Sequence, residues 1–433
     1  VGATSQSGDI TITSEEAIVV GQQAFGVFAI SGAGAVDITS GSVSTAGAES
    51  VGIYARGGQV TISSEVVTTT GARAVGIEAR SAAGDVVIDS GSVTTGGYLA
   101  TGIMVDADGA IAGGAFRPAA GGTGAVTITS GTIVTTGNDA WGIGVDHIGP
   151  VDITSESITT SGLYAAGITV YGGDTITIDS GSVETQAGAG IIAWGDTGDV
   201  TIDSDDVVVG PVGDIGVFAR TSTGDIVINA GRTETRLVGI LGGQYTGDAI
   251  GAFSQTGDIT ITSTEAVVVG EQAFGLYGIT GSGAVTITSG SVATAGVGGT
   301  GIYASGGTVV VDSGSITTTG ALAGGIFADG DDGVSIASDS IVVSGADATG
   351  IRASSGAGDV AVTSGDVSAL GAGSLGINLS AAAGRATLTI NGGVVGDRLG
   401  VGVGADAIAV TVEADGSVTS TNGVCLILTA WGP

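Results

Sequence analysis

Four aspartates form the clearest candidate for chemistry in this chain. Asp179 and Asp203 hold the same position of two consecutive sequence repeats, and Asp205 and Asp206 follow directly. If the repeats stack as parallel strands, the first two carboxylates lie about 4.8 Å apart. Such a pair could act as a general acid and base, or could hold a calcium ion through oxygen ligands. This position also holds Thr, Ser, Asp or Asn in other repeats, as at Thr13, Ser63 and Asp89, so a plain solvated surface is the competing interpretation.

Aromatic residues form a second candidate, because they return at one outward position just after a Gly-apolar pair. They are Phe28, Tyr54, Phe218, Tyr277, Tyr303 and Phe327. Monomeric proteins seldom expose aromatic side chains in rows. Exposed rings can dock sugar rings or the apolar face of a partner, which predicts a ligand-binding surface. The alternative is stacking between neighbouring strands for stability alone.

Other reactive residues are scarce. His147 is the single histidine, and it follows Asp146 in a turn with no repeated partner, so we expect it to be solvated and not to serve as the base of a triad. Cys425 is the single cysteine, which excludes an intrachain disulfide and a cysteine-based metal cluster. We therefore predict that the chain is not an enzyme. The alternative is a glycan-active β-helix, either a polysaccharide hydrolase or a lyase, which would use clustered acids.

The elements that carry these residues come from a short repeat. A pattern of apolar, polar, apolar, polar and Ser returns about every 25 residues, which is typical of a solenoid. The second apolar residue of each copy is Ile12, Ile38, Ile62, Ile88, Ile128, Ile153, Ile178, Ile202, Ile228, Ile261, Ile287, Val311, Ile336, Val362 and Leu388.

Each repeat predicts three short strands separated by glycine-containing turns, as in residues 37–40, 42–45 and 51–55. Alternation along the strands places Ile12 inside the coil. It also places Phe25 and Val27 inside, with Phe28 outside.

These features predict an all-β chain, a right-handed parallel β-helix of about sixteen coils that forms a single domain over residues 1–433. The composition agrees, since β-branched residues abound and lysine is absent. Glycine supplies 85 residues but without a Gly-X-Y period, which excludes collagen. The handedness follows from the general rule for parallel crossovers.

Two insertions interrupt the repeat, near residues 108–124 and 232–252. Insertions in solenoids usually emerge as loops, which are natural places for binding. Residues 413–433 form a C-terminal segment whose apolar part, Val424 to Trp431, could be a cap or an assembly face. We expect the N-terminal coil of one copy to stack on the C-terminal end of another, giving a head-to-tail filament with self as the partner.

The charge of the chain restricts its partners. The formal net charge is −32, and all ten cationic residues are arginines. Nucleic acid is therefore excluded as a partner. No stretch approaches the roughly 18 apolar residues of a membrane-spanning helix. Residues 8–80 align without gaps to residues 257–329 at an offset of 249, which indicates that blocks of coils were duplicated.

A family resemblance extends over nearly the whole chain. It rests on the repeated segments Gly8-Asp-Ile-Thr-Ile12, Ser42-Val-Ser-Thr45 and Gly52-Ile-Tyr-Ala55. The chain resembles the passenger domains of bacterial autotransporters and the related filamentous-haemagglutinin-like adhesins. That resemblance implies an extracellular protein, secreted to the bacterial cell surface, that acts in adhesion, aggregation or biofilm formation. Its partners would be surface glycans or other cells. We therefore predict a structural or adhesive surface rod.

Overall fold

The computed structural model describes residues 1–81, 83–106, 122–236 and 247–430. Its elements are strands that pair in parallel, coil upon coil, with about fifteen turns at a spacing of about 26 residues. This confirms the predicted right-handed parallel β-helix.

The chain divides into two compact units. The first unit comprises Val1–Gly213 with Val217–Thr221, and the second comprises Asp214–Gly216 with Ser222–Pro433. A single domain over residues 1–433 stays a prediction.

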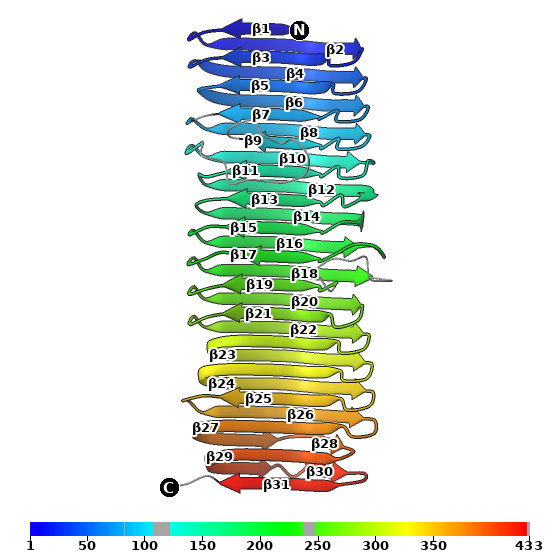
Figure 1. Ribbon diagram of the computed structural model, residues 1–433, viewed down its shortest axis with the longest axis vertical. Helices are drawn as coiled ribbons and strands as arrows, with labels where there is room; N and C mark the ends of the chain where they lie inside the picture. Colours follow the sequence, from blue (N-terminus) through cyan, green and yellow to red (C-terminus); the bar gives the residue numbers. More distant parts are fainter. Residues whose placement is uncertain (82, 107–121, 237–246, 431–433) are drawn as a thin grey trace. The chain divides into compact units, whose positions relative to one another are not determined.

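In the first unit each coil contains one long strand and one short strand (Figure 1). The long strands are β2 (Ile10–Val20), β4 (Ala35–Ala46), β6 (Gln59–Thr70), β8 (Val86–Gly96), β10 (Val126–Thr135), β12 (Val151–Leu163), β14 (Ile176–Ala187) and β16 (Val200–Val209). The short strands are β1 (Gly2–Ser5), β3 (Phe25–Ser31), β5 (Val51–Gly57), β7 (Ile77–Ser81), β9 (Ile103–Asp106), β11 (Ile143–His147), β13 (Ile168–Gly172), β15 (Ile191–Gly195) and β17 (Val217–Arg220).

The second unit repeats this plan, but in some coils the short strand runs on into the long one. Its strands are β18 (Ile226–Arg236), β19 (Ile250–Ser254), β20 (Ile259–Val269), β21 (Phe274–Thr280), β22 (Val285–Ala295), β23 (Thr300–Thr319), β24 (Gly324–Ser344), β25 (Thr349–Ser355), β26 (Val360–Leu370), β27 (Leu375–Ile390), β28 (Gly393–Gly396), β29 (Leu399–Val412), β30 (Ser417–Ser420) and β31 (Val424–Ala430).

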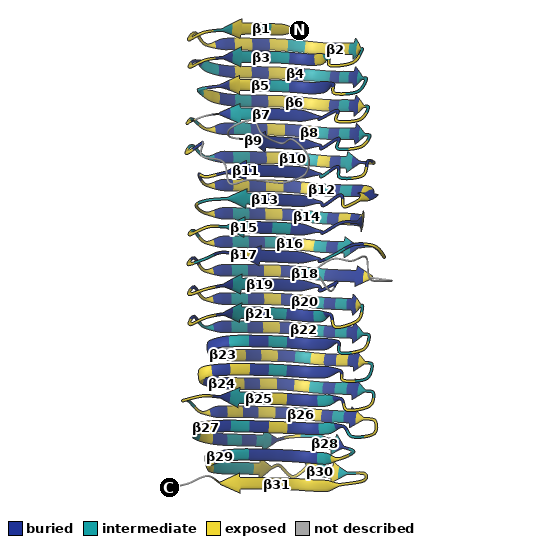
Figure 2. Ribbon diagram, viewed as in Figure 1, coloured by how far each residue is buried: buried dark blue, intermediate teal, exposed yellow. Residues whose placement is uncertain are grey.

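The core of each unit is built from stacked β-branched residues. Ile153, Ile178 and Ile202 are register partners in β12, β14 and β16, and all three are fully buried. The alternation of buried and exposed residues is visible along the long strands in Figure 2. Because one apolar residue of each coil lies on the equivalent residue of the next, the repeat period of the sequence becomes a continuous hydrophobic column.

The first two predicted strands of a coil are one long strand in the structure. In β14, Ile178 and Ser180 are buried, the alternation then changes phase at Gly181, and Val183 and Thr185 are buried next. The ladder between β14 and β16 skips Gly181, which marks a corner within the strand. Three alternating runs thus remain in each coil, but hydrogen bonding continues around the first corner.

The turn from long to short strand has a fixed chemistry, shown by residues 69–74. The buried Thr69 Oγ1 donates a hydrogen bond of 2.7 Å to the carbonyl oxygen of Ala74. Arg73 has a positive φ of 59°, and its N–H donates to the carbonyl oxygen of Tyr98 in the next coil at 2.6 Å. Left-handed non-glycine residues recur at this turn position, namely Gln23, Glu49, Arg73, Leu99, Asp139, Tyr164, Gln272, Leu322 and Asp347.

The turn from a short strand to the next long strand explains why the sequence repeats a Gly-Asp pair. The N–H of Gly257 donates to Ser254 Oγ at 2.9 Å, and Asp258 Oδ1 accepts the N–H of Ala284 from the next coil at 2.7 Å. The Ser closes a turn with its own backbone, while the Asp joins one coil to the next. The aspartates of these Gly-Asp pairs therefore have a structural role.

Most of the first predicted insertion and about half of the second lie outside the described residues. Their flanks keep the register, since Ile88 pairs with Ile128 and Ile228 pairs with Ile261. Within the predicted C-terminal segment, β31 pairs with β29 and is exposed at every residue (Figure 2). Trp431 lies outside the described part, and head-to-tail assembly stays a prediction.

One predicted orientation is wrong. Phe25 was expected inside the coil, but its side chain is 37 % exposed, whereas Val27 and Ala29 are fully buried. The strict alternation fails because Gly26, which lacks a side chain, is itself buried and lies against the Val43 side chain and the backbone of Gly52. Phe25 instead lies beside Phe28 on the outer surface.

Candidate functional site

The outward side of the short strands, here called the short-strand face, carries the predicted aromatic residues. In the first unit one column of register partners on this face, the ring column, contains Phe28 in β3 and Tyr54 in β5, then Glu78 in β7. Two residues further along each strand lies a second column with Ile30, Arg56 and Arg80. Residues two apart on a strand point to the same side, so the two columns form one surface.

Phe25, Phe28 and Tyr54 form the first aromatic cluster. The centroid of the Phe25 ring lies 5.0 Å from that of Phe28 and 5.6 Å from that of Tyr54, and the rings of Phe28 and Tyr54 stack at 5.7 Å with planes 18° apart. Arg80 lies over the Tyr54 ring at 5.8 Å. Because Phe28 and Tyr54 are only half-buried, the cluster presents ring surface to solvent.

The second unit contains an equivalent cluster of Phe274, Tyr277 and Tyr303. The Phe274 ring lies 5.6 Å from Tyr277 and 5.5 Å from Tyr303, and Tyr277 pairs with Tyr303 in the ladder. In the second unit the register partner of Tyr303 in β24 is Phe327, and the register partner of Phe327 in β25 is Arg352. The three rings lie 249 residues after Phe25, Phe28 and Tyr54, so the duplication noted in the sequence preserved the whole cluster.

Phe218, the remaining predicted residue, lies in a different setting. It is only 9 % exposed, and its ring packs edge-on against Trp194 at 6.4 Å. Trp194 also contacts Tyr171 at 5.3 Å and lies under Arg220 at 5.6 Å. The six predicted aromatics are thus divided into separate groups and do not form one continuous row.

Three arginines of the first unit, Arg56, Arg80 and Arg220, lie on short strands. Arg80 makes an ion pair with Glu78 at 2.5 Å, which compensates its charge. Arg56 is exposed and is the register partner of Arg80. Among the residues that the structure describes, no acidic side chain pairs with Arg56.

The predicted acidic cluster is present in part. Asp179 and Asp203 are register partners on β14 and β16, and Asp206 pairs with Ser182. Asp205 lies at the corner that the ladder skips. Within the described part of the chain, no three His, Cys, Asp or Glu side chains come together in a way that could hold a metal ion. The pair could still share a cation with other ligands, and calcium binding stays a prediction.

His147 differs from the prediction, because it is buried and not solvated. It ends β11, is 2 % exposed, and its Nε2 lies 2.6 Å from the carbonyl oxygen of Gly124. A Cβ on Gly122 would lie 2.4 Å from the imidazole Cε1, so the ring is enclosed by backbone. Burial lowers the pKa of His147, which keeps the ring neutral.

One carboxyl group of the second unit, that of Asp214, has a raised pKa. Burial, together with the nearby charge of Asp248, raises the pKa of Asp214 to about 6. Asp248 Oδ1 accepts the N–H of Phe274 at 2.7 Å. These two aspartates therefore lie directly beside the start of the second aromatic cluster.

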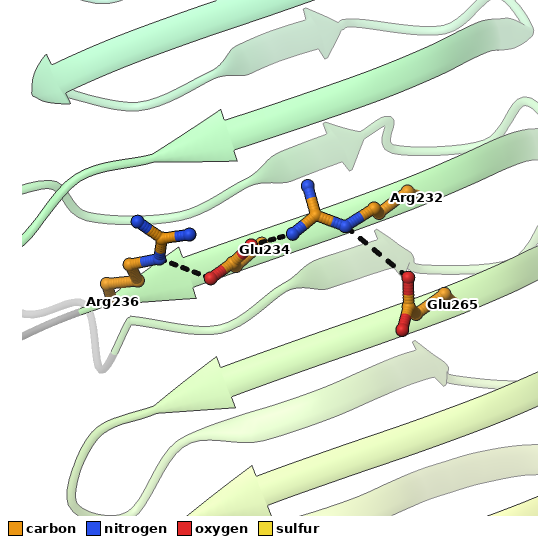
Figure 3. A network of polar contacts seen from close by, with 4 residues as sticks. All are labelled: Arg232, Glu234, Arg236 and Glu265. Carbon is orange, nitrogen blue, oxygen red and sulfur yellow. Dashed lines mark hydrogen bonds and ion pairs between the residues drawn. The ribbon is translucent and has the colours of Figure 1, made fainter.

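A polar network on β18 shows how other arginines are compensated (Figure 3). Glu234 lies between Arg232 and Arg236 and pairs with both, and Arg232 Nε reaches Glu265 on β20 at 3.4 Å. Two cations and two anions balance one another. This network joins neighbouring coils and leaves no charge for a ligand.

Sequence reasoning missed Phe25, Phe274 and the arginines. The arginines had a recognisable signal, a Gly-apolar-Xaa-Ala-Arg segment that ends at Arg56, Arg80 and Arg220. Phe25 and Phe274 could have been found from the repeated Gln-Ala-Phe-Gly segment, had the buried glycine been anticipated.

Comparisons with protein-family models, with curated proteins and with solved structures found no match to this chain. Among the residues described, none forms a helix with the length and hydropathy that crossing a bilayer requires.

Proposed function

We propose that the chain is an extracellular structural or adhesive β-helix protein of a bacterial surface, similar in role to autotransporter passengers, and that it binds surface glycans through its aromatic clusters. The supporting observation is that the same partly exposed three-ring cluster occurs in each unit, at equivalent register positions. Exposed aromatic groups of this kind typically mark a ligand or partner surface.

Aromatic rings suit a saccharide because each ring offers a flat apolar face to the C–H groups of a sugar. The half-buried state of Tyr54 and Tyr303 fits this role, since each ring is held by packing but keeps one surface open. Pre-ordered rings lose little conformational entropy on binding.

The test is binding of the purified chain to an immobilised glycan panel and to whole bacterial cells. We expect the double variant Phe28→Ala with Tyr54→Ala to weaken binding at the first cluster about threefold to tenfold per ring. The control is Tyr98→Ala, because Tyr98 is 51 % exposed and lies outside both clusters. Equal losses in the double variant and the control would contradict the proposal.

The alternative, a glycan-active enzyme, is tested on the same samples. Release of new reducing ends from a bound polysaccharide, abolished by Asp179→Asn with Asp203→Asn, would replace adhesion by catalysis. We expect no such release, because the aromatic groups are spread over several coils and the aspartate pair lies on the long strands.

A further inference from the structure

The two aromatic clusters share their rings but differ in the charges beside them. At the offset of 249 residues, Arg56 corresponds to Ser305 and Arg80 corresponds to Asp329. Ser305 and Asp329 are register partners on β23 and β24, as Arg56 and Arg80 are on β5 and β7. The duplication therefore supplies a natural pair of sites, one with arginines at these two positions and one with a serine and an aspartate.

Arg56 is placed to reach a ligand on the first cluster. It lies two residues after Tyr54 on the same strand and the same side, so their Cα atoms are about 7 Å apart. Its side chain is exposed, and no acidic partner for it exists among the described residues. Arg80 already pairs with Glu78 and lies over the Tyr54 ring, which leaves the Arg56 charge open.

The net charge of the whole chain restricts the class of ligand that the first cluster can bind. A net charge of −32 repels a polyanion, so neither a nucleic acid nor a highly charged acidic polymer fits. A single carboxylate beside an apolar ring face does fit, because one guanidinium can bind it bidentately.

We propose that the first cluster, Phe25, Phe28 and Tyr54 with Arg56, binds a sugar unit bearing one carboxylate, whereas the second cluster, Phe274, Tyr277 and Tyr303, prefers neutral sugar. This inference rests on the proposed glycan-binding function and specifies the ligand class for each cluster. The rings hold the sugar face, and the Arg56 guanidinium donates hydrogen bonds to the carboxylate oxygens.

The test compares two disaccharide probes that differ in one group: cellobiose, and cellobiouronic acid, in which a carboxylate replaces the terminal hydroxymethyl group. To isolate the first cluster, both are titrated by calorimetry into the full chain carrying Tyr277→Ala and Tyr303→Ala. We expect the acidic probe to bind about fivefold more tightly at low salt, and the preference to shrink as salt is added. Arg56→Ser, which installs the residue of the second cluster, should abolish the preference, so that the two probes bind with equal affinity.

The reciprocal variant tests the second cluster. In a chain carrying Phe28→Ala and Tyr54→Ala, Ser305→Arg should create a preference for the acidic probe once its register partner is neutralised by Asp329→Asn. An acidic preference that survives Arg56→Ser would overturn the inference while the proposed function stands, and so would equal binding of a glutamate-rich peptide. Failure of the full chain to bind any saccharide would overturn both.

Discussion

Replacing Ile178 by Asp tests the assignment of inner and outer faces most directly. Ile178 is fully buried, and its register partners Ile153 and Ile202 are fully buried as well. Losing the isoleucine side chain costs about 2–5 kcal/mol. A carboxylate without a partner adds roughly 2 kcal/mol or more for its lost hydration. The total, about 4–7 kcal/mol, is a large fraction of the stability of a typical domain.

The neighbouring Asp179 provides the matched control. It is exposed, one residue along the same strand, so Asp179→Ile should change stability by less than about 0.5 kcal/mol. The assay is amide hydrogen exchange, since coils of a solenoid can open locally and a single melting temperature then averages over them. We expect Ile178→Asp to remove protection from β12, β14 and β16 first.

The pH dependence of stability distinguishes the effect of the new charge from the effect of the changed side-chain shape. Burial would raise the pKa of the new carboxyl above its unfolded value, so the variant is most stable below about pH 4 and loses stability as pH rises through the raised pKa. Ile178→Asn has a similar shape without the charge and should show no such dependence. Protection in Ile178→Asp equal to that in Asp179→Ile at neutral pH would refute the assignment of faces.

Three further outcomes follow from the described residues. The pKa of Asp214 is raised to about 6, so its contribution to stability is present below about pH 4 and is lost as pH rises through 6. Over this pH interval the melting temperature of Asp214→Asn should therefore rise relative to that of the native chain. A constant difference between the two melting temperatures would contradict this prediction. Leu322 is 61 % exposed and has a φ of 61°, a conformation that favours glycine. Leu322→Gly should therefore raise the free energy of unfolding by about 0.5–1 kcal/mol in denaturant titrations. A lower free energy of unfolding would show that the Leu322 side chain packs more than expected. If Asp179 and Asp203 bind calcium, a chelator should lower the melting temperature of the native chain but not that of a chain carrying Asp179→Asn and Asp203→Asn, and an equal drop in both chains would contradict a site at this pair.

The fold could be predicted from the sequence because a solenoid repeats one local solution. The spacing of Ile12, Ile38 and Ile62 already indicated stacked coils, and the structure places Ile38 and Ile62 in one buried column with Ile12. The position of Phe28 and Tyr54 in neighbouring strands followed from the same period. Prediction succeeded where each residue has the same environment in every coil.

Prediction failed where neighbouring coils differ. His147 looked like a turn residue, but backbone from the preceding coil encloses it. The alternation of apolar residues predicted that Phe25 lies inside the coil. Gly26 instead approaches the next coil closely, and the Phe25 ring lies outside.

The sequence by itself therefore determined the coil period, the buried column and the duplication of the rings. Only the tertiary structure decided which ring contacts which, that Arg80 is neutralised by Glu78, and that Arg56 is not. The physical reason is that periodic burial is set by nearest neighbours along the chain. The contacts between rings of different coils, and of Arg80 with the Tyr54 ring, instead depend on distances between side chains about 25 residues apart, which exist only once the coils have stacked.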